Sequence, residues 1–279
     1  MSYSVKTTPK TTVFWLTFLL LPLAAFAQKS VYLEDLTTHE VAAMVKNSPS
    51  VVIIPVGGTE QNGPHMAIGK HNIRVKVLAG RIAQQLSSQT AVQKINAIVA
   101  PVVSYVPEGN IEPPTEHMKW AGTISISEDA FKSMLLSAAR SFKQHGFTDI
   151  VIVGDSGNYQ AQLAQVAATF NKDAKNAPAR VHFIGDYYKA TQAGYIAALK
   201  AKGLSDAEIG THAGSADTSL LLAIEPAMVK PDKFAEAAKE GRAGGTGGDP
   251  RAATAALGQI AAESVVKMGV LAIQKAILK

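Results

Sequence analysis

The chain alternates short, mainly apolar runs with longer segments of helical spacing, and this alternation restricts the folds open to it. The apolar runs lie at 51–55, 97–103, 149–153 and 181–185. Between them, segments 75–87, 127–145 and 159–170 carry apolar residues three to four positions apart. Fully apolar strands that alternate with helices are typical of a parallel sheet covered by helices on both faces. The sequence therefore predicts an α/β fold.

The remaining segments complete one domain. Ser127 is suited to begin a helix, because its side-chain oxygen can accept a hydrogen bond from a free backbone N–H. The Gly-rich stretch 241–250 predicts a mobile loop. No linker divides residues 28–279, which we expect to form a single domain. The other expected elements are helices over 33–46 and 189–200, a strand over 122–126, and a closing helix or pair of helices over 253–278.

The first 27 residues have the features of a secretory signal peptide. Lys6 and Lys10 give a basic start, residues 13–25 form an uncharged apolar run, and Ala25-Phe26-Ala27 offers small residues for cleavage before Gln28. A membrane anchor would need about 20 apolar residues and would not end in an Ala-x-Ala site. We therefore expect a periplasmic or secreted protein that has no membrane partner once the signal is cleaved.

Composition excludes several kinds of site. The chain contains no Cys, which rules out thiolate ligands, thiol nucleophiles and disulfides. Without the leader, 25 basic residues face 22 acidic ones, and a net charge of +3 is too small to indicate a nucleic-acid partner. A metal in this chain would have to be bound by oxygen and nitrogen ligands.

A polar loop after the first apolar run carries the strongest candidates for chemistry. Beyond Val51-Val-Ile-Ile54 the chain reads Pro55-Val-Gly-Gly-Thr-Glu60-Gln-Asn62-Gly-Pro-His65-Met-Ala-Ile-Gly-Lys-His71-Asn72. Open α/β sheets bind ligands beyond the carboxyl ends of their strands, which is where this loop begins. Glu60, His65 and His71 offer ligands that suit zinc or manganese. Ordinary hydrogen bonding within a polar loop is the alternative.

Four motifs in order resemble the creatininase (creatinine amidohydrolase) family. They are Pro55-Val-Gly-Gly-Thr-Glu60-Gln-Asn62-Gly-Pro-His65-Met, His117-Met-Lys-Trp-Ala-Gly122-Thr-Ile-Ser, Val151-Ile-Val-Gly-Asp-Ser156-Gly-Asn158 and His212-Ala-Gly-Ser-Ala-Asp217-Thr-Ser. The resemblance implies a one-domain, three-layer α/β/α sandwich with a mostly parallel central sheet, assembled as a homo-oligomer and often as a hexamer. It also implies a pair of divalent metals that activate water against amide C–N bonds of small molecules.

Several metal positions of that family carry other residues in this chain. The family's Glu-Gln-His-Gly motif supplies a carboxylate and an imidazole; Glu60 matches the first, and Asn62 stands at the second. The Asp that bridges both metals in the family is His71 here, a His ligand is Ser156, and a Glu is Asn158. Two dications need more negative charge than one carboxylate supplies. We therefore expect one metal ion rather than two.

The resemblance also assigns roles to single residues. His212 stands at the family's His-x-Gly position, where a histidine is proposed to shuttle protons, and Asp217 replaces the Glu of Glu-Thr-Ser. We expect Glu60 and His71 to hold zinc or manganese with help from His65, His117, Asp155 or water. We expect Glu60 and His212 to act in catalysis. The residues expected to line the substrate site are Asn62, His117, Trp120, Asp155, Asn158 and Asp217.

Two alternatives to metal-dependent amide hydrolysis stay open. Gly154-Asp-Ser156-Gly matches the nucleophile segment of trypsin-like proteases and lies at a strand-turn-helix junction, so Ser156 could be a catalytic nucleophile with His212 and Asp217. A creatininase-fold protein without metals could instead keep the pocket for binding alone. The leading prediction is a metal-dependent amidohydrolase that acts on a non-peptide C–N bond of a small molecule.

Overall fold

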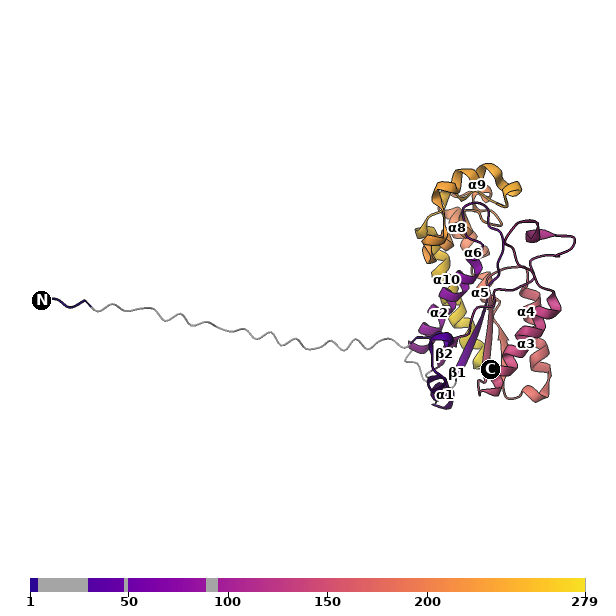
Figure 1. Ribbon diagram of the computed structural model, residues 1–279, viewed down its shortest axis with the longest axis horizontal. Helices are drawn as coiled ribbons and strands as arrows, with labels where there is room; N and C mark the ends of the chain where they lie inside the picture. The colour runs from indigo at the N-terminus through magenta and orange to yellow at the C-terminus, as the bar shows by residue number, and fades with distance from the viewer. Residues whose placement is uncertain (5–29, 48–49, 89–94, 279) are drawn as a thin grey trace.

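The computed structural model describes residues 1–4, 30–47, 50–88 and 95–278, and its centre is a parallel sheet (Figure 1). The predicted signal peptide lies mostly outside these residues, at 5–29. The sheet has four strands in the order β2-β1-β3-β4, and every pairing is parallel. The strands are β1 (Ser50–Val56), β2 (Asn96–Val99), β3 (Asp149–Gly154) and β4 (Arg180–Phe183). The predicted parallel sheet is confirmed.

Helices cover both faces of the sheet, because alternate strand residues point to opposite sides and nearly all are apolar. Val51 and Ile53 of β1 belong to one hydrophobic core, and Val52 and Ile54 belong to the other. The first core contains residues of α2 (Lys70–Ser88), α5 (Asp186–Lys189), α6 (Ala193–Ala201), α8 (Ser215–Ile224) and α10 (Ala255–Ile277). The second contains residues of α3 (Glu128–Gln144) and α4 (Gln160–Lys172), with α1 (Thr38–Asn47) packed at its border. The result is three layers (Figure 1).

The ends of several elements differ from the prediction. Residues 122–126 do not form a strand; a single parallel bridge joins Ser125 to Val106. The reason is that the N–H groups of Ile124 and Ile126 donate to the loop carbonyls of Thr59 and Val106, and not to a sheet strand. The helix predicted over 189–200 is divided into α5 and α6. Ser127 caps α3 as expected, by accepting a hydrogen bond from the N–H of Ala130.

Helix α10 is long and apolar enough to cross a membrane by length and composition alone, the one such helix within the described ranges. Its buried side chains, which include Ala262, Val265 and Ile273, belong to the core. Gly258 brings it so close to α8 that a Cβ there would meet the carbonyl oxygen of Ser219 at 1.8 Å. These contacts are those of a core helix in a globular domain.

The Gly-rich stretch 241–250, predicted to be mobile, folds into two short 3-10 turns with α9 (Phe234–Glu240) before it. Thr246 is buried, and a Cβ on Gly245 would collide with the side chain of Gln61. A short helix, α7 (Asp206–Ile209), lies just before the loop that carries His212. Segment 241–250 therefore packs against the loop that follows β1.

Candidate metal centre and its charge network

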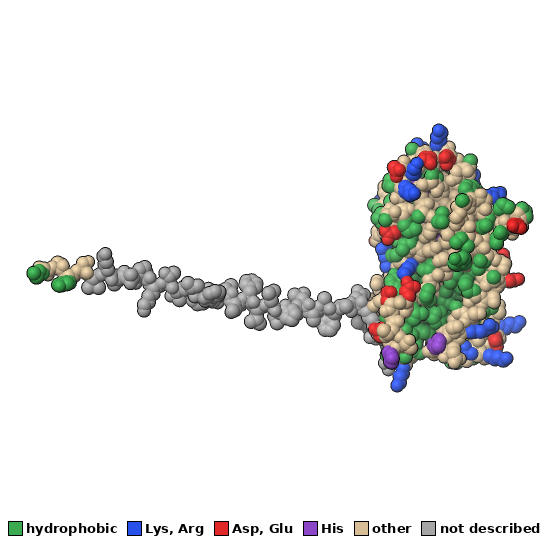
Figure 2. Space-filling model, viewed as in Figure 1, with side chains coloured by type: hydrophobic (Ala, Val, Ile, Leu, Met, Phe, Trp, Pro, Cys, Tyr) green, Lys and Arg blue, Asp and Glu red, His purple; other side chains and the backbone are tan. Residues whose placement is uncertain are grey.

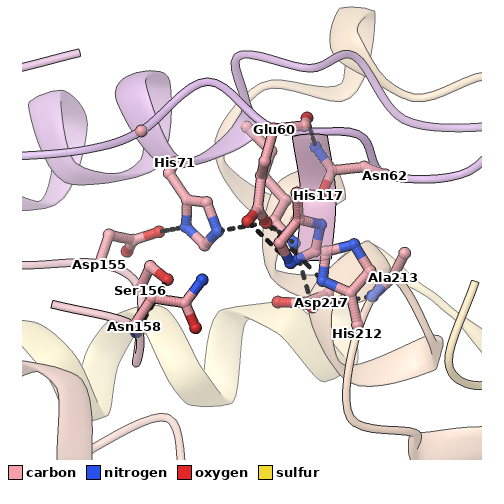
Figure 3. A network of polar contacts seen from close by, with 12 residues as sticks. Glu60, Asn62, His71, His117, Asp155, Ser156, Asn158, His212, Ala213 and Asp217 are labelled. Atoms are coloured by element: carbon pink, nitrogen blue, oxygen red, sulfur yellow. Dashed lines mark hydrogen bonds and ion pairs between the residues drawn. The ribbon is translucent and has the colours of Figure 1, made fainter. Parts of the chain in front are cut away.

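A polar cavity of about 410 Å³ opens at the carboxyl ends of β1 and β3, where the sequence predicts the site. Its walls come from the loop after β1, the first turn of α2, the loop after β3, and the start of α8. Figure 3 shows their side chains converging on Glu60. The ionisable and polar residues that line the cavity include Glu60, Lys70, His71, Arg74, His117, Asp155, Ser156, Asn158, His212 and Asp217.

Buried hydrogen bonds fix the loops that carry these side chains. The Tyr159 hydroxyl accepts from the N–H groups of Asp155 and Ser156 at 3.2 and 3.0 Å, and it donates to the carbonyl of Val56 at 2.9 Å. The ends of β1 and β3 are thereby tied to each other. The Asn62 amide donates to the carbonyl of Glu60 at 2.9 Å and so holds the polar loop in its turn.

His71 lies between two buried carboxylates. Its Nε2 is 2.8 Å from Oε1 of Glu60, and its Nδ1 is 2.5 Å from Oδ2 of Asp155. Each ring nitrogen faces an acceptor, so both must carry a proton. Burial alone would lower the pKa of His71, but the charge of Glu60 and the hydrogen bonds to Asp155 and Glu60 outweigh it and raise the pKa. His71 is therefore a buried cation, with no nitrogen left for a metal.

Two further cations from the same helix complete this network. Arg74 contacts Asp155 and Asp217, each at 2.8 Å, and Lys70 contacts Glu60 and Asp217, each at 3.3 Å. Lys70, His71 and Arg74 are all buried on the inner face of α2. Burial raises the pKa of Asp217, but Lys70 and Arg74 lower it by more, so Asp217 stays ionised. Three cations balance three carboxylates.

Glu60, His117 and His212 form the group of described residues able to hold a metal ion, with one ligand atom from each within 4.8 Å of the others. Nε2 of His117 lies 3.4 Å from Oε2 of Glu60, and Nδ1 of His212 lies 3.7 Å from Oε1. Ligands bound at about 2.1 Å in a tetrahedral site are about 3.4 Å apart. The observed separations match a single ion.

The hydrogen bonds of His212 determine which of its nitrogens is free. Nε2 lies 2.9 Å from the carbonyl oxygen of Gln61, which can only accept, so Nε2 carries the proton. In the neutral ring Nδ1 then presents a lone pair to the carboxylate of Glu60. A cation placed between Nδ1 and the carboxylate would be bound by both. The Gln61 amide nitrogen also lies 3.3 Å from Nδ1 of His117 and 3.2 Å from Nε2 of His212, but as a donor it cannot form a hydrogen bond with the protonated Nε2.

Protonation states agree with a metal-binding role. Burial lowers the pKa of His117, and burial together with the charge of Lys70 lowers the pKa of His212 to about 4. Burial would raise the pKa of Glu60, but His71 and Lys70 lower it well below its usual range. Two neutral imidazoles and one carboxylate are the protonation states that a divalent ion needs.

Strained backbone accompanies both histidines. Glu116 has φ 45° and Ala213 has φ 55°, and they are the described non-glycine residues with positive φ. Each is the immediate neighbour of a histidine in the group, His117 or His212. Backbone strain of this kind persists only where the surroundings hold it, and it is concentrated at functional sites.

Only some of the predicted site residues lie around one point in the structure. Glu60 lies at the centre, but the partners within reach of a shared ion are His117, predicted to bind substrate or assist the metal, and His212, predicted to act in catalysis. His71 uses both nitrogens on carboxylates. His65 is fully buried elsewhere, with Nε2 3.0 Å from the Thr218 hydroxyl. The predicted ligand set of Glu60, His71 and His65 does not assemble around one point.

The residues predicted to bind the substrate do not all line the same cavity. Asp155, Ser156, Asn158 and Asp217 line the cavity, whereas Trp120 lines a second one next to it. Asn62 supports the backbone of the loop and is almost fully buried.

The proposed Ser156 triad is not assembled in the described residues. The Ser156 hydroxyl accepts a long hydrogen bond of 3.4 Å from the N–H of Asn158. The ring nitrogens of His212 face Glu60 and Gln61 instead, and Asp217 is engaged by Lys70 and Arg74. No described histidine is hydrogen-bonded to Ser156.

Sequence reasoning missed several residues of the site. Lys70 and Arg74 are four positions apart, on the helix face that also carries Val75 and Leu78. Cations on an apolar face indicate a buried charge network, and this signal was available. Glu108 lies beneath the site and receives a hydrogen bond from Asn158 at 2.9 Å. Burial and the nearby charge of Glu60 raise the pKa of Glu108 to about 8.

Comparisons of sequence agree with this site over most of the chain. A family model described as creatinine amidohydrolase (creatininase) matches residues 34–273. The mycofactocin precursor peptide peptidase of Mycolicibacterium smegmatis is 30% identical over 239 residues, covering 80% of this chain and 82% of the relative. The creatinine amidohydrolase of Pseudomonas putida is 25% identical over 217 residues, covering 75% and 77%.

Solved structures show the same fold. A structure described as manganese creatininase superposes with a TM-score of 0.71 at 22% identity, covering 89% of this chain and 99% of its own. A crystal structure of creatinine amidohydrolase gives 0.72 at 21% identity, covering 89% and 98%. The expected three-layer α/β/α sandwich is confirmed.

Proposed function

Because the chain belongs to the creatininase family, we propose that it is a hydrolase that cleaves an amide C–N bond with one divalent ion held by Glu60, His117 and His212. The observation that carries this proposal is the lone pair of His212 Nδ1, which faces the Glu60 carboxylate at 3.7 Å. A zinc or manganese ion bound there would act as a Lewis acid toward the amide carbonyl and lower the pKa of a water molecule.

The chain's own residues would bind and orient the substrate. Ser156, Asn158 and Tyr188 line the cavity with groups that hydrogen-bond to an amide. The paired charges of α2 keep Glu60 ionised and fixed. Hydrolysis forms a C–O bond and breaks the C–N bond, and the departing amine takes up a proton from water.

The substrate class in this proposal is wider than the sequence prediction. A relative at 30% identity is named as a peptidase of a precursor peptide, and a relative at 25% identity is named as a creatinine amidohydrolase. We therefore include peptides, in addition to the small cyclic or linear amides first expected.

Export and assembly belong to the same proposal. The basic start, apolar run and Ala-x-Ala site support cleavage after Ala27 and a periplasmic or secreted location. Hydrophobic side chains gather on the face drawn in Figure 2, and a homo-oligomer would cover such a surface. N-terminal sequencing of the exported protein and its mass in solution would test these two points.

Metal binding tests the central claim. Chelated protein titrated with zinc or manganese should take up about one equivalent, the ratio of a mononuclear site. His117→Ala and His212→Ala should abolish tight uptake, and His145→Ala, at an exposed residue, should retain it. Release of amine from a panel of cyclic amides, linear amides and peptides then measures turnover. Metal uptake without turnover of any member would support a binding protein; the absence of uptake would refute the proposal.

A further inference from the structure

A second cavity adjoins the site. It has a volume of about 320 Å³, and His117 and His212 line both it and the first cavity. The two rings are 4.7 Å apart between centroids, tilted by 47°. The candidate metal group therefore lies where the two cavities meet. A substrate whose scissile bond reaches this group can extend into both, and a chain of linked residues has that shape.

The two cavities differ in charge. In the first, Lys70, His71 and Arg74 are each paired with carboxylates of the same cavity. In the second, the charged side chains are Lys119, Arg242 and Glu116. Neither Lys119 nor Arg242 forms an ion pair with another described residue, and both are exposed. Without counting histidines, the second cavity has an excess of positive charge, which favours an anionic group on the ligand.

Other residues of the second cavity suit an organic anion better than a bare ion. Trp120 is half-buried and offers an aromatic surface. Thr246 is buried, and its hydroxyl has no hydrogen-bond partner among the described residues. An unpaired hydroxyl, an aromatic face and two cations together recognise a carboxylate attached to a side chain or backbone.

We propose that the substrate is a linear amide or peptide with a free carboxylate, and that Arg242 and Lys119 bind this carboxylate in the second cavity. The proposal rests on the proposed function, since it places the scissile bond beside His117 and His212. The uncharged part of the substrate then occupies the first cavity, where all charges are already paired.

Tryptophan fluorescence can test the carboxylate site without metal or turnover. The chain has two tryptophans, and Trp15 lies in the proposed leader, so protein that begins at Gln28 has Trp120 as its sole reporter. The probes are acetyl-glycyl-phenylalanine with a free carboxylate and the same compound as its C-terminal amide. We expect the acid to bind chelated protein roughly tenfold more tightly than the amide, the difference expected for a charge-assisted contact.

Matched variants locate the effect. The double variant Lys119→Gln/Arg242→Gln should remove the preference for the acid, whereas Arg251→Gln, at an exposed arginine outside both cavities, should keep it. Equal binding of the two probes, or a preference that survives the double variant, overturns the proposal. If the preference is present but the protein takes up no metal, the proposed function fails and the carboxylate site stands.

Discussion

On one side of Glu60, three buried cations are paired with carboxylates; on the other, two neutral imidazoles face the same carboxylate with nothing positive between them. We refer to Lys70, His71, Arg74, Asp155 and Asp217 as the paired half, and to Glu60, His117 and His212 as the open half. The two halves differ in whether the chain itself supplies the positive charge. The three cations of the paired half balance Asp155, Asp217 and the shared Glu60, whereas the open half adds two neutral imidazoles that offer ligand atoms for a further cation.

If the proposed single ion is bound, the difference explains how a two-metal arrangement can be reduced to one. The related family is expected to have a bridging Asp at the position of His71. An imidazolium there delivers positive charge where a metal would otherwise do so, and Arg74 and Lys70 neutralise the other carboxylates. A chelator should therefore leave the ion pairs of the paired half intact, and added metal should bind only at the open half.

Removal of Arg74 should have the largest effect on stability. Arg74→Met leaves Asp155 and Asp217 short of a cation in a buried place, and breaking such a pair costs about 3–5 kcal/mol. Urea unfolding of the chelated protein would measure the loss. Arg251→Met is the matched control, because its pair with Asp249 is exposed and should contribute little to stability. A similar loss in both variants would contradict the paired half.

The substitution His71→Asp should create a second metal-binding position within the paired half. His71→Asp removes a buried cation and adds a carboxylate between Glu60 and Asp155, so the chelated protein should lose about 3 kcal/mol of unfolding free energy. Zinc or manganese should restore stability, and uptake should rise from about one to about two equivalents per chain.

His71→Asn separates the two effects of that change. It removes the cation without adding a carboxylate, so it should be destabilised and still bind about one equivalent. If His71→Asp also stops at one equivalent, the imidazolium does not stand in for a second metal.

The sequence predicted the fold better than it predicted the ligand set. The four strands follow from apolar runs, because local hydrophobicity decides which segments are buried on both sides. The ligands depend on distant segments: Glu60, His117 and His212 come from three loops, and only the folded sheet brings them together. His65 and His71 lie closer to Glu60 in the sequence, and the prediction chose them as ligands for that reason. In the structure His65 contacts Thr218 and His71 contacts Asp155, so neither histidine shares a metal position with Glu60 and a second ligand.

His65 is a third kind of histidine to compare, because its imidazole is buried outside both halves. Burial lowers its pKa to about 4 from the usual 6.5, so the unfolded chain binds the proton more readily. Its contribution to stability is present above about pH 6.5 and is lost as the pH falls toward 4. Between pH 7 and pH 5 this loss is about 2 kcal/mol. Urea unfolding at both values should show a smaller loss in His65→Gln than in the wild type; equal losses would mean that His65 is not buried in its neutral form.

Substitution of Gln61 should have the smallest effect, and it should change only the affinity of the open half for metal. Its amide nitrogen lies beside both rings, 3.3 Å from Nδ1 of His117 and 3.2 Å from Nε2 of His212, and limits their movement by contact without touching the ion. Loss of such a supporting group weakens metal binding by about tenfold. Calorimetric titration of Gln61→Ala should show this weaker affinity at an unchanged stoichiometry, while Gln259→Ala, at an exposed residue on α10, should bind like the wild type. Since the backbone carbonyl of Gln61 still holds His212, a complete loss of binding would show that the amide does more than orient the rings.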